Sequence, residues 1–340
     1  MNLKILLLNT AIFLIYNIME KKLLQFFTEN GTIEKKEKEK RRFFVMIFKG
    51  VALPKPLAER EVEYIKELYA ERKYKDAIAH LRSLGYKTPT AAMIKTPEQI
   101  EGCREAGRIN SLILDAVERE IRVGMSTQDI DDIVMEETKR LGGTAACLGY
   151  EGFPKSVCTS VNSVVCHGIP SKKVILREGD IVNVDCTTKY EGYYGDASRM
   201  FTFGEISPEA QSLVNLTREA TMAAVEHIKP YSTYLGDIGY IINTAAKAKG
   251  FSVVREIGGH GVGLEMHEDP YVCHIGFMQR GMMLLPGMIF TIEPMINAGS
   301  GHVYINPIDG WTIYTSDGSL SAQVEHEVLV TEDGFEILSK

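Results

Sequence analysis

The pattern of hydrophobic and polar positions first indicates a pair of adjacent strands near the middle of the chain. Ile181–Thr188 and Tyr193–Phe201 are rich in β-branched and aromatic residues, and Lys189–Gly192 between them provides a turn glycine. If the strands fold back on each other, Asp185 and Asp196 lie nearly opposite and share one sheet face. Two carboxylates that close repel each other and are costly to desolvate, which favours a shared proton or bound divalent cations. The alternative is a surface hairpin with two unrelated acidic residues.

Capping residues and amphipathic spacing predict two pairs of helices, the second pair repeating the first. The expected helices span residues 96–122, 126–141, 207–230 and 232–250. Strand-like sequence follows each pair, at 164–203 and again at 251–338. Two such halves predict an α+β domain with pseudo-twofold symmetry, in which helices cover one sheet face. The other face would then hold a site between the halves.

The first 91 residues differ from this pattern. The apolar run Ile5–Tyr16 is short and interrupted, which makes a signal anchor the less favoured interpretation. We favour a mis-assigned start codon, with Met19 or Met46 as the true start. Membrane attachment is therefore not expected. Apolar spacing between residues 61 and 84 predicts two short amphipathic helices. We expect a poorly defined N-terminal segment at 1–50, a helical accessory extension at 51–91 and the principal domain at 92–340.

Charge is distributed unevenly along the chain. Of its 340 residues, 38 are Lys or Arg and 45 are Asp or Glu, for a net charge of −7. Residues 1–90 contain 18 basic and 11 acidic residues, whereas the remaining residues contain 20 and 34. The basic arm is either a solvated extension or a contact surface for a polyanion such as RNA. The acidic body gives no reason to expect DNA binding.

The composition is that of a soluble globular protein, with 45% hydrophobic and 24% charged residues. Six cysteines form no C-x-x-C pair and no regular framework. Such spacing is typical of free thiols in a reducing compartment, so we expect a cytoplasmic protein without a cysteine zinc site.

Three further residues stand where ordinary core packing does not explain them. His260 lies among glycines in G-G-H-G, which leave room around its ring. Glu293 and Glu325 lie within the apolar runs M-I-F-T-I-E-P-M and S-A-Q-V-E-H-E-V-L-V, where an unpaired carboxylate is costly. Taken singly, each glutamate is explained equally well as an acid on an edge strand.

Together with the hairpin aspartates, these residues form a set of four carboxylates and one imidazole: Asp185, Asp196, His260, Glu293 and Glu325. The set is rich in oxygen and contains no thiol, which favours borderline or hard divalent ions over a structural thiolate zinc site. Four carboxylates balance two divalent ions, and two ions about 3.5–4 Å apart are the arrangement of aminopeptidases and related hydrolases.

Five motifs, in order, make the chain similar to a known family. They are V-C-H-G-I-P at 165–170, the Asp185/Asp196 hairpin, G-G-H-G-V-G followed by M-H-E-D-P, P-G-M-I-F-T-I-E-P-M, and S-A-Q-V-E-H. Over residues 92–338 the sequence resembles the type I methionine aminopeptidases. The resemblance implies the pita-bread fold of that family, whose pseudo-twofold halves agree with the repeat.

The resemblance also implies a role for each residue of these motifs. Two divalent ions, with the metal left open among Co, Mn, Fe and Zn, would be bound by Asp185, Asp196, His260, Glu293 and Glu325, of which Asp196 and Glu325 would bridge both ions. Glu293 would in addition transfer a proton. His167 would steady the scissile nitrogen, and His267 would contact the scissile carbonyl oxygen.

A soft, polarizable pocket for a methionine side chain is implied in the same way, formed by Cys147, Tyr150, Phe153, Cys158, Met266 and Trp311. Without the motifs, these residues would be interpreted as ordinary core. Phe153 and Met266 depart from family members that often have Tyr and Phe there, and Glu327 replaces an uncharged residue. The motifs contain no counterpart of His274, His302 and His326, which we treat as ordinary polar residues.

The function implied is removal of the initiator methionine from nascent chains whose second residue is small, by a cytoplasmic monomer. The basic arm would bring the enzyme to the ribosome. The nearest alternative is an Xaa-Pro aminopeptidase or prolidase of the same fold. A second is a non-catalytic relative that binds protein or RNA, against which the presence of all five candidate ligands argues.

Overall fold

The computed structural model of the chain describes residues 56–340, which belong to one compact unit. The predictions for the apolar run and the rest of residues 1–55 lie outside the described residues. The domain boundaries drawn from the sequence stay a prediction. Within residues 56–340, no helix has both the length and the apolar character needed to cross a membrane.

Two short amphipathic helices, α3 (Glu59–Ala70) and α4 (Tyr74–Ser83), form the start of the described chain, as predicted. After α4, Gly85 adopts a φ of 90°, a conformation that favours glycine and ends the helix. Buried side chains of both helices, among them Ile65 and Leu81, belong to the same hydrophobic cluster as residues of the principal domain. The accessory extension therefore shares a core with the sheet-bearing part of the chain.

Four longer helices follow in the two predicted pairs: α5 (Pro97–Glu120) and α6 (Thr127–Arg140), then α7 (Pro208–Glu226) and α8 (Leu235–Ala248). Thr96 and Ser126 begin the first pair with capping boxes, which satisfy backbone N–H groups of the first turn. Two predicted bounds were wrong by a few residues. α7 ends before the predicted Pro230, and α8 starts only after Tyr234, whose N–H donates to the Asp237 carboxylate at 2.9 Å.

The strands are short except in the central hairpin. They are β1 (Thr144–Ala145), β2 (Cys158–Val161), β3 (Val164–Cys166), β4 (Ile181–Tyr190), β5 (Tyr193–Thr202), β6 (Ser252–Val253), β7 (Gly259–Gly261), β8 (Glu268–Val272), β9 (Ile289–Ile292), β10 (Met295–Asn297), β11 (Val303–Ile305), β12 (Ile313–Thr315), β13 (Ser321–Gln323), β14 (Glu325–Val330) and β15 (Phe335–Ser339). In the described part of the chain, the main sheet has the order β1-β4-β5-β14-β9-β7-β8, with β2 beside β4 and β15 beside β14. Two smaller sheets are β13-β10-β6 and β11-β12-β3.

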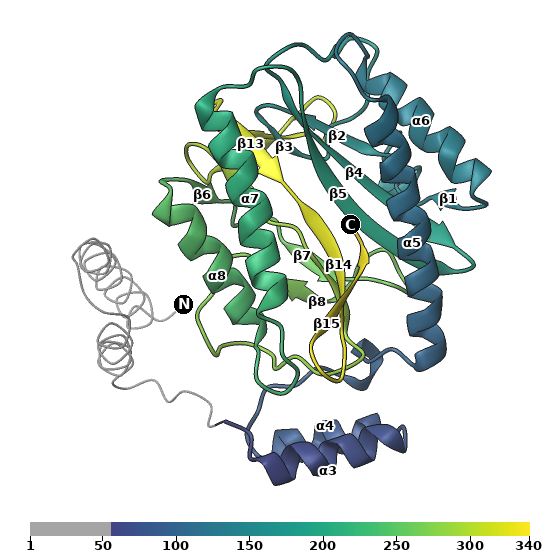
Figure 1. Ribbon diagram of the computed structural model, residues 1–340, viewed down its shortest axis with the longest axis vertical. Coiled ribbons are helices and arrows are strands. Elements are labelled where there is room, and N and C mark those ends of the chain that lie inside the picture. Colours follow the sequence, from purple (N-terminus) through teal and green to yellow (C-terminus); the bar gives the residue numbers. More distant parts are fainter. Residues whose placement is uncertain (1–55) are drawn as a thin grey trace. The chain divides into compact units, whose positions relative to one another are not determined.

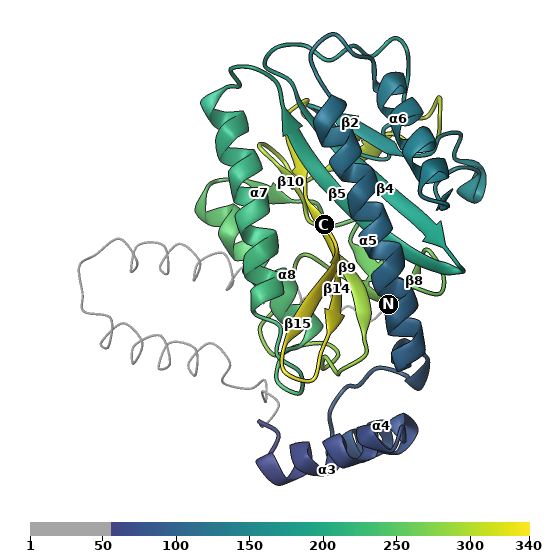
Figure 2. The same ribbon diagram turned by 45° about the vertical axis from the view of Figure 1, so that its right-hand side comes forward.

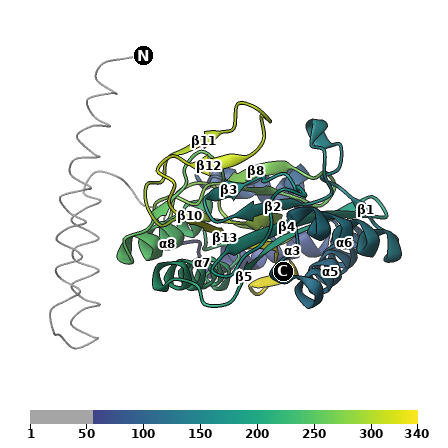
Figure 3. The same cartoon turned by 90° about the horizontal axis from the view of Figure 1, so that it is seen from above.

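The helices of both halves cover the same face of the main sheet (Figure 1). α5 packs on β4 and β5, whereas α7 packs on β13 and β10 and also contacts β14 and β9 (Figure 2). Seen from above, α5 to α8 lie on one side of the strands, and β11 and β12 lie on the other (Figure 3). The α+β architecture with helices on one sheet face is confirmed.

The central hairpin is longer, and its turn tighter, than predicted. β4 and β5 pair along ten residues, so Lys189 and Tyr190 belong to a strand and not to the turn. Glu191 and Gly192 alone form the turn, with φ angles of 49° and 92°, as a type I′ turn requires. This turn type matches the twist of the strands that it joins, which explains why pairing continues up to the turn.

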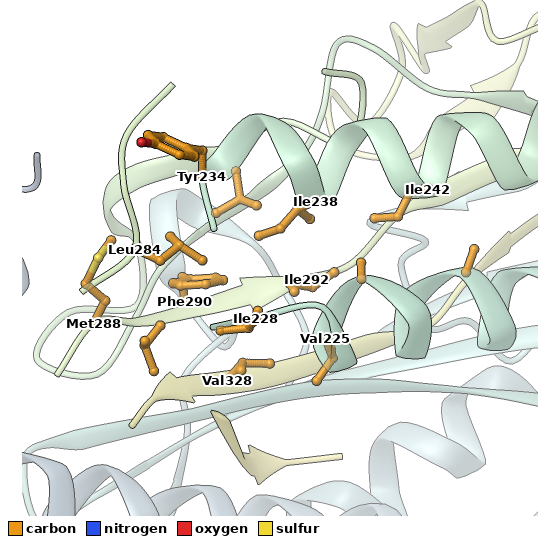
Figure 4. Close-up of a cluster of buried hydrophobic side chains, with 14 of the residues drawn as sticks. Val225, Ile228, Tyr234, Ile238, Ile242, Leu284, Met288, Phe290, Ile292 and Val328 are labelled. Carbon is orange, nitrogen blue, oxygen red and sulfur yellow. The ribbon is translucent and has the colours of Figure 1, made fainter. Parts of the chain in front are cut away.

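The core of each half lies between its helices and the strands beneath them. In the second half, Ile238 of α8, Val225 of α7 and Phe290 of β9 belong to one hydrophobic cluster, in which Phe290 is fully buried (Figure 4). In the first half, α5 and α6 cover the hairpin residues Val182, Val184, Cys186 and Ala197. These residues alternate with Asp185 and Asp196, so both aspartates point away from the helices.

Candidate active site

Strand register brings three candidate ligands to the sheet face opposite the helices. Asp185 on β4 and Glu325 on β14 both lie opposite Ser198, one on each side of β5. Asp196 is two residues from Ser198 on the same strand. Cross-strand partners and every second residue share a face, so the three carboxylates point to the same side.

The same register adds two candidate ligands from the second half. β14 pairs with β9 so that Glu293 lies opposite Glu325, just past the end of β9. β7 pairs with the other side of β9 so that His260 lies opposite Thr291, whose hydroxyl accepts the His260 backbone N–H at 3.0 Å. Asp196, His260 and Glu325 each offer one ligand atom within 4.8 Å of the others. The structure thus brings the five predicted ligands to one face; their binding of metal remains a prediction.

The orientation of His260 fits a bound cation. Its Nδ1 lies 3.0 Å from the Gly261 carbonyl oxygen, which can only accept, so Nδ1 carries the proton. Burial lowers the pKa of His260 to about 3, so the ring is neutral. The lone pair of Nε2 then lies 3.4 Å from Glu293 Oε1 and 3.8 Å from Asp196 Oδ2. An imidazole lone pair among carboxylate oxygens is a donor set for a divalent ion.

The carboxylates carry more negative charge than their neighbours balance. Glu325 is buried, and its Oε2 has no hydrogen-bond partner among the described residues. Burial, followed by repulsion from other carboxylates, raises the pKa of Asp196 and of Glu325 well above the usual range. Burial likewise raises the pKa of Asp185 to about 7 and that of Glu293 to about 8. Divalent cations would offset this buried charge.

Neutral side chains hold two of the carboxylates in place. The Thr187 hydroxyl donates to Asp196 Oδ1 at 2.9 Å. The Thr291 hydroxyl donates to Glu293 Oε1 at 2.7 Å, and the Gln323 amide donates to Glu293 Oε2 at 3.2 Å. Contacts of this kind fix the orientation of a metal ligand. None of the three neutral residues was predicted, because a threonine or glutamine in a strand carries no signal of its own.

Two ionisable residues support the ligands through the backbone. His274, treated above as an ordinary polar residue, is buried, and its Nε2 accepts the Glu293 backbone N–H at 3.2 Å. Glu327 is fully buried, and its Oε2 accepts the Asp196 backbone N–H at 3.0 Å. The ladder between β5 and β14 stops at His326, so the Glu327 carboxylate replaces a missing backbone acceptor. Alternation with Glu325 indicated the face of Glu327, but not this contact.

His167 lies in a tightly packed loop after β3. Its φ of 54° is in the left-handed region that few non-glycine residues adopt, and such strain is common at functional sites. A Cβ on the next residue, Gly168, would lie 2.1 Å from the Thr159 carbonyl oxygen, so only glycine fits there. Burial lowers the pKa of His167 to about 4, which leaves the ring neutral. Its ring lies edge-on to Trp311, with 6.1 Å between centroids.

His267 lies at the exposed end of the loop between β7 and β8. Its ring is edge-on to that of His260, with 4.3 Å between centroids. Its Nδ1 shares a hydrogen bond of 2.7 Å with the Tyr150 hydroxyl. The loop thus places His267 beside the candidate ligands and one of the predicted pocket residues.

The six predicted pocket residues lie in one hydrophobic cluster: Cys147, Tyr150, Phe153, Cys158, Met266 and Trp311. The rings of Phe153 and Trp311 meet edge-on with 5.2 Å between centroids. Cys158 lies opposite Asp185 across β2 and β4, which joins this cluster to the candidate ligands. Ala146, Ile169 and Tyr194 also contact the cluster and were not predicted.

Comparisons with known proteins agree with this geometry. Residues 101–332 match metallopeptidase family M24. Methionine aminopeptidase A of Synechocystis is 47% identical over 241 residues, which cover 71% of this chain and 94% of that protein. Methionine aminopeptidase of Escherichia coli K12 is 45% identical over 253 residues, which cover 73% and 94%.

Solved structures show the same fold. Methionine aminopeptidase from Rickettsia prowazekii has a TM-score of 0.71 and 42% identity, covering 73% of this chain and 99% of that chain. The prolidase from Pyrococcus furiosus has a TM-score of 0.58 and 27% identity, covering 73% of this chain and 65% of that chain.

Proposed function

Because the chain belongs to metallopeptidase family M24, and within it to the type I methionine aminopeptidases, we propose that it removes the N-terminal methionine from chains whose second residue is small. One observation above all supports this function. Asp196, His260 and Glu325 converge within 4.8 Å beside a cluster of sulfur-containing and aromatic side chains. As a metallopeptidase, the protein depends on a divalent metal.

Two divalent ions would be held by Asp185, Asp196, His260, Glu293 and Glu325, with Asp196 and Glu325 shared between them. Four carboxylates, three of them buried, support two ions, because a single ion would leave negative charge uncompensated. This donor set accepts Co, Mn, Fe and Zn alike. When bound, the ions supply the acidity that makes water a nucleophile near neutral pH.

Glu293 would take a proton from the attacking water and later deliver it to the leaving amine. Thr291 and Gln323 each bind one of its carboxylate oxygens, so its position is fixed before substrate arrives. Preorganisation of this kind lowers the cost of reaching the transition state.

The two histidines would bind the scissile amide. If the Tyr150 hydroxyl donates to Nδ1 of His267, the ring proton lies on Nε2 and can be donated to the carbonyl oxygen as charge develops there. His167 would contact the scissile nitrogen, because its strained loop orients the ring toward Trp311 and the pocket.

Hydrolysis of three peptides by the metal-loaded protein tests the proposal. We expect free methionine from Met-Ala-Ser, release at least about tenfold slower from Met-Leu-Ser, and no cleavage of Ala-Pro. Metal analysis after anaerobic purification should find two ions per chain. Preferred cleavage of Ala-Pro would support the prolidase alternative, and equal rates on Met-Ala-Ser and Met-Leu-Ser would contradict the small-residue requirement.

We also propose that the enzyme acts as a cytoplasmic monomer on nascent chains at the ribosome. Residues 1–55 contain 11 Lys and Arg against 5 Asp and Glu, and basic contacts to phosphate give an attraction that weakens with salt. A variant beginning at Pro56 retains α3 and α4, whose side chains are part of the core. It should cleave short peptides normally and co-sediment less with ribosomes at low salt than the full chain. Equal, salt-insensitive sedimentation of both would contradict this role.

A further inference from the structure

Lys95 is a buried cation outside the proposed mechanism. Its side chain is 2% exposed and forms an ion pair with Glu268, which is 15% exposed. A lysine is rarely buried unless it is paired, because an isolated buried charge is costly. Lys95 directly precedes Thr96, the N-cap of α5, and so lies where the accessory extension joins the principal domain.

Glu268 binds the loop between β7 and β8 at its base. One carboxylate oxygen contacts the Lys95 ammonium, and the other accepts the backbone N–H of Leu264 at 2.6 Å and that of Glu265 at 2.9 Å. Met266 and His267 lie between these amides and Glu268 itself. The Glu268 carboxylate therefore closes a short turn that contains both proposed substrate contacts, Met266 and His267.

Gly263 packs the other end of the loop against Lys95. Its φ of 132° favours glycine, and a Cβ there would lie 2.7 Å from Cys103 Sγ and 3.3 Å from Lys95 Cε. The Gly263 carbonyl accepts the Tyr194 N–H at 2.9 Å. The stem of Lys95 thus contacts one end of the loop while its ammonium binds the other.

Lys95 also reaches the strand that leads to Glu293. Its backbone N–H donates to the Gly287 carbonyl at 2.8 Å, in the turn before β9. A Cβ on Gly287 would lie 3.2 Å from the Lys95 carbonyl oxygen, so the two segments are in close backbone contact. One residue therefore joins the loop of His267 to the strand of a candidate ligand.

We propose that Lys95 and Glu268 are positioning residues, which fix the loop of residues 262–267 and through it the preference of the pocket for methionine. The inference rests on the proposed function, because it assigns Met266 and His267 to substrate. Removing the ammonium leaves the Glu268 carboxylate buried without a counter-ion, so the loop rearranges to hydrate it. Met266 and His267 then lose their fixed positions.

Kinetics of three variants in the full chain test this proposal. Lys95→Met keeps the stem and removes the charge, Glu268→Gln keeps the shape, and the double variant leaves no unpaired charge. Asn110→Ala is the control, since Asn110 is buried in α5 and bonds Ser339 and Thr188 without contacting the loop. We measure kcat and KM for Met-Ala-Ser and Leu-Ala-Ser, together with bound metal.

We expect Lys95→Met to lower kcat/KM for Met-Ala-Ser about a hundredfold and the preference for methionine over leucine about tenfold, with metal content unchanged. The double variant should lose less than the sum of the single losses, because it leaves no buried charge unpaired. The control should retain the wild-type preference. If Lys95→Met loses activity only in proportion to the fraction unfolded and retains the preference for methionine over leucine, the proposal is overturned.

Hydrogen exchange at Leu264 and Glu265, measured by mass spectrometry without substrate, separates the loop from the reaction. These amides should exchange faster in Lys95→Met and in Glu268→Gln, and at the wild-type rate in Asn110→Ala. Unchanged exchange in all variants would overturn the positioning role even if the enzyme is active. If these amides exchange faster in the two variants but the wild-type protein releases no methionine, the positioning role stands and the proposed function is contradicted. If Lys95→Met fails to fold, the double variant carries the same test.

Discussion

In the first half of the principal domain, Asp185 and Asp196 come from a single hairpin that pairs along ten residues around a two-residue turn. In the second half, the candidate ligands His260 and Glu325 come from β7 and β14, and Glu293 lies just past the end of β9. Alternation and pairing place both aspartates on the site face, and the Thr187 hydroxyl adds one contact to Asp196. Glu293, which no strand contains, instead depends on hydrogen bonds from the side chains of Thr291 and Gln323.

The largest effects should come from the two ligands that would bridge the metals, one from each half. Asp196→Asn and Glu325→Gln each remove one charge from the site. We expect kcat to fall about a thousandfold or more in both, because bound ions would lower the barrier by an amount on the order of several kcal/mol. Kinetics with metal analysis measure this. Full metal content with activity within about tenfold of wild type, in either variant, would rule out the two-metal assignment.

The next effects concern one histidine from each half. His167→Ala and His267→Ala should each lower kcat about a hundredfold while metal occupancy stays intact, because both residues act on substrate. Occupancy is measured beside kcat in the same preparations. Metal lost from the His167 variant would place that residue among the ligands.

A matched pair of threonines tests the comparison directly. Thr291→Val removes the hydroxyl that bonds Glu293, and Thr187→Val removes the hydroxyl that bonds Asp196. We expect the first to weaken metal binding by about 10- to 100-fold and the second by several-fold less, since the hairpin still holds Asp196. Calorimetric titration of metal into the apo variants provides the affinities. Equal losses would show that both halves depend on side-chain support alike.

Substitutions of Glu327 should change metal affinity least, and they separate the effect of its charge from that of its hydrogen bond. Glu327→Gln keeps an oxygen that can accept the Asp196 N–H, so metal affinity should stay near the wild-type value. Glu327→Leu leaves that N–H buried without a partner and should weaken metal binding about tenfold. If Gln and Leu weaken binding equally, the charge of Glu327 matters and its hydrogen bond does not.

The same contrast explains what the sequence could predict. Helices, capping residues and the shared face of Asp185 and Asp196 follow from local periodicity, and the structure agrees on each. The position of β14 between β5 and β9 depends on contacts between distant segments, which no local pattern contains. Motifs predicted the candidate ligands of the second half, but the supporting residues Thr291, Gln323 and His274 follow from tertiary contacts alone. The turn was predicted at Lys189–Gly192, two residues too long, because Lys189 and Tyr190 suit either a strand or a loop.

In the main sheet of the described residues, the two halves meet through two residue pairs, Glu325 with Ser198 and His326 with Ala197. Pairing segments this far apart in sequence costs loop-closure entropy, so we expect these two pairs to form late in folding. A folding intermediate with only one half formed would hold two or three of the five candidate ligands. Helix signals during refolding would therefore recover before high-affinity metal binding, and the delay between them would measure how quickly the halves join.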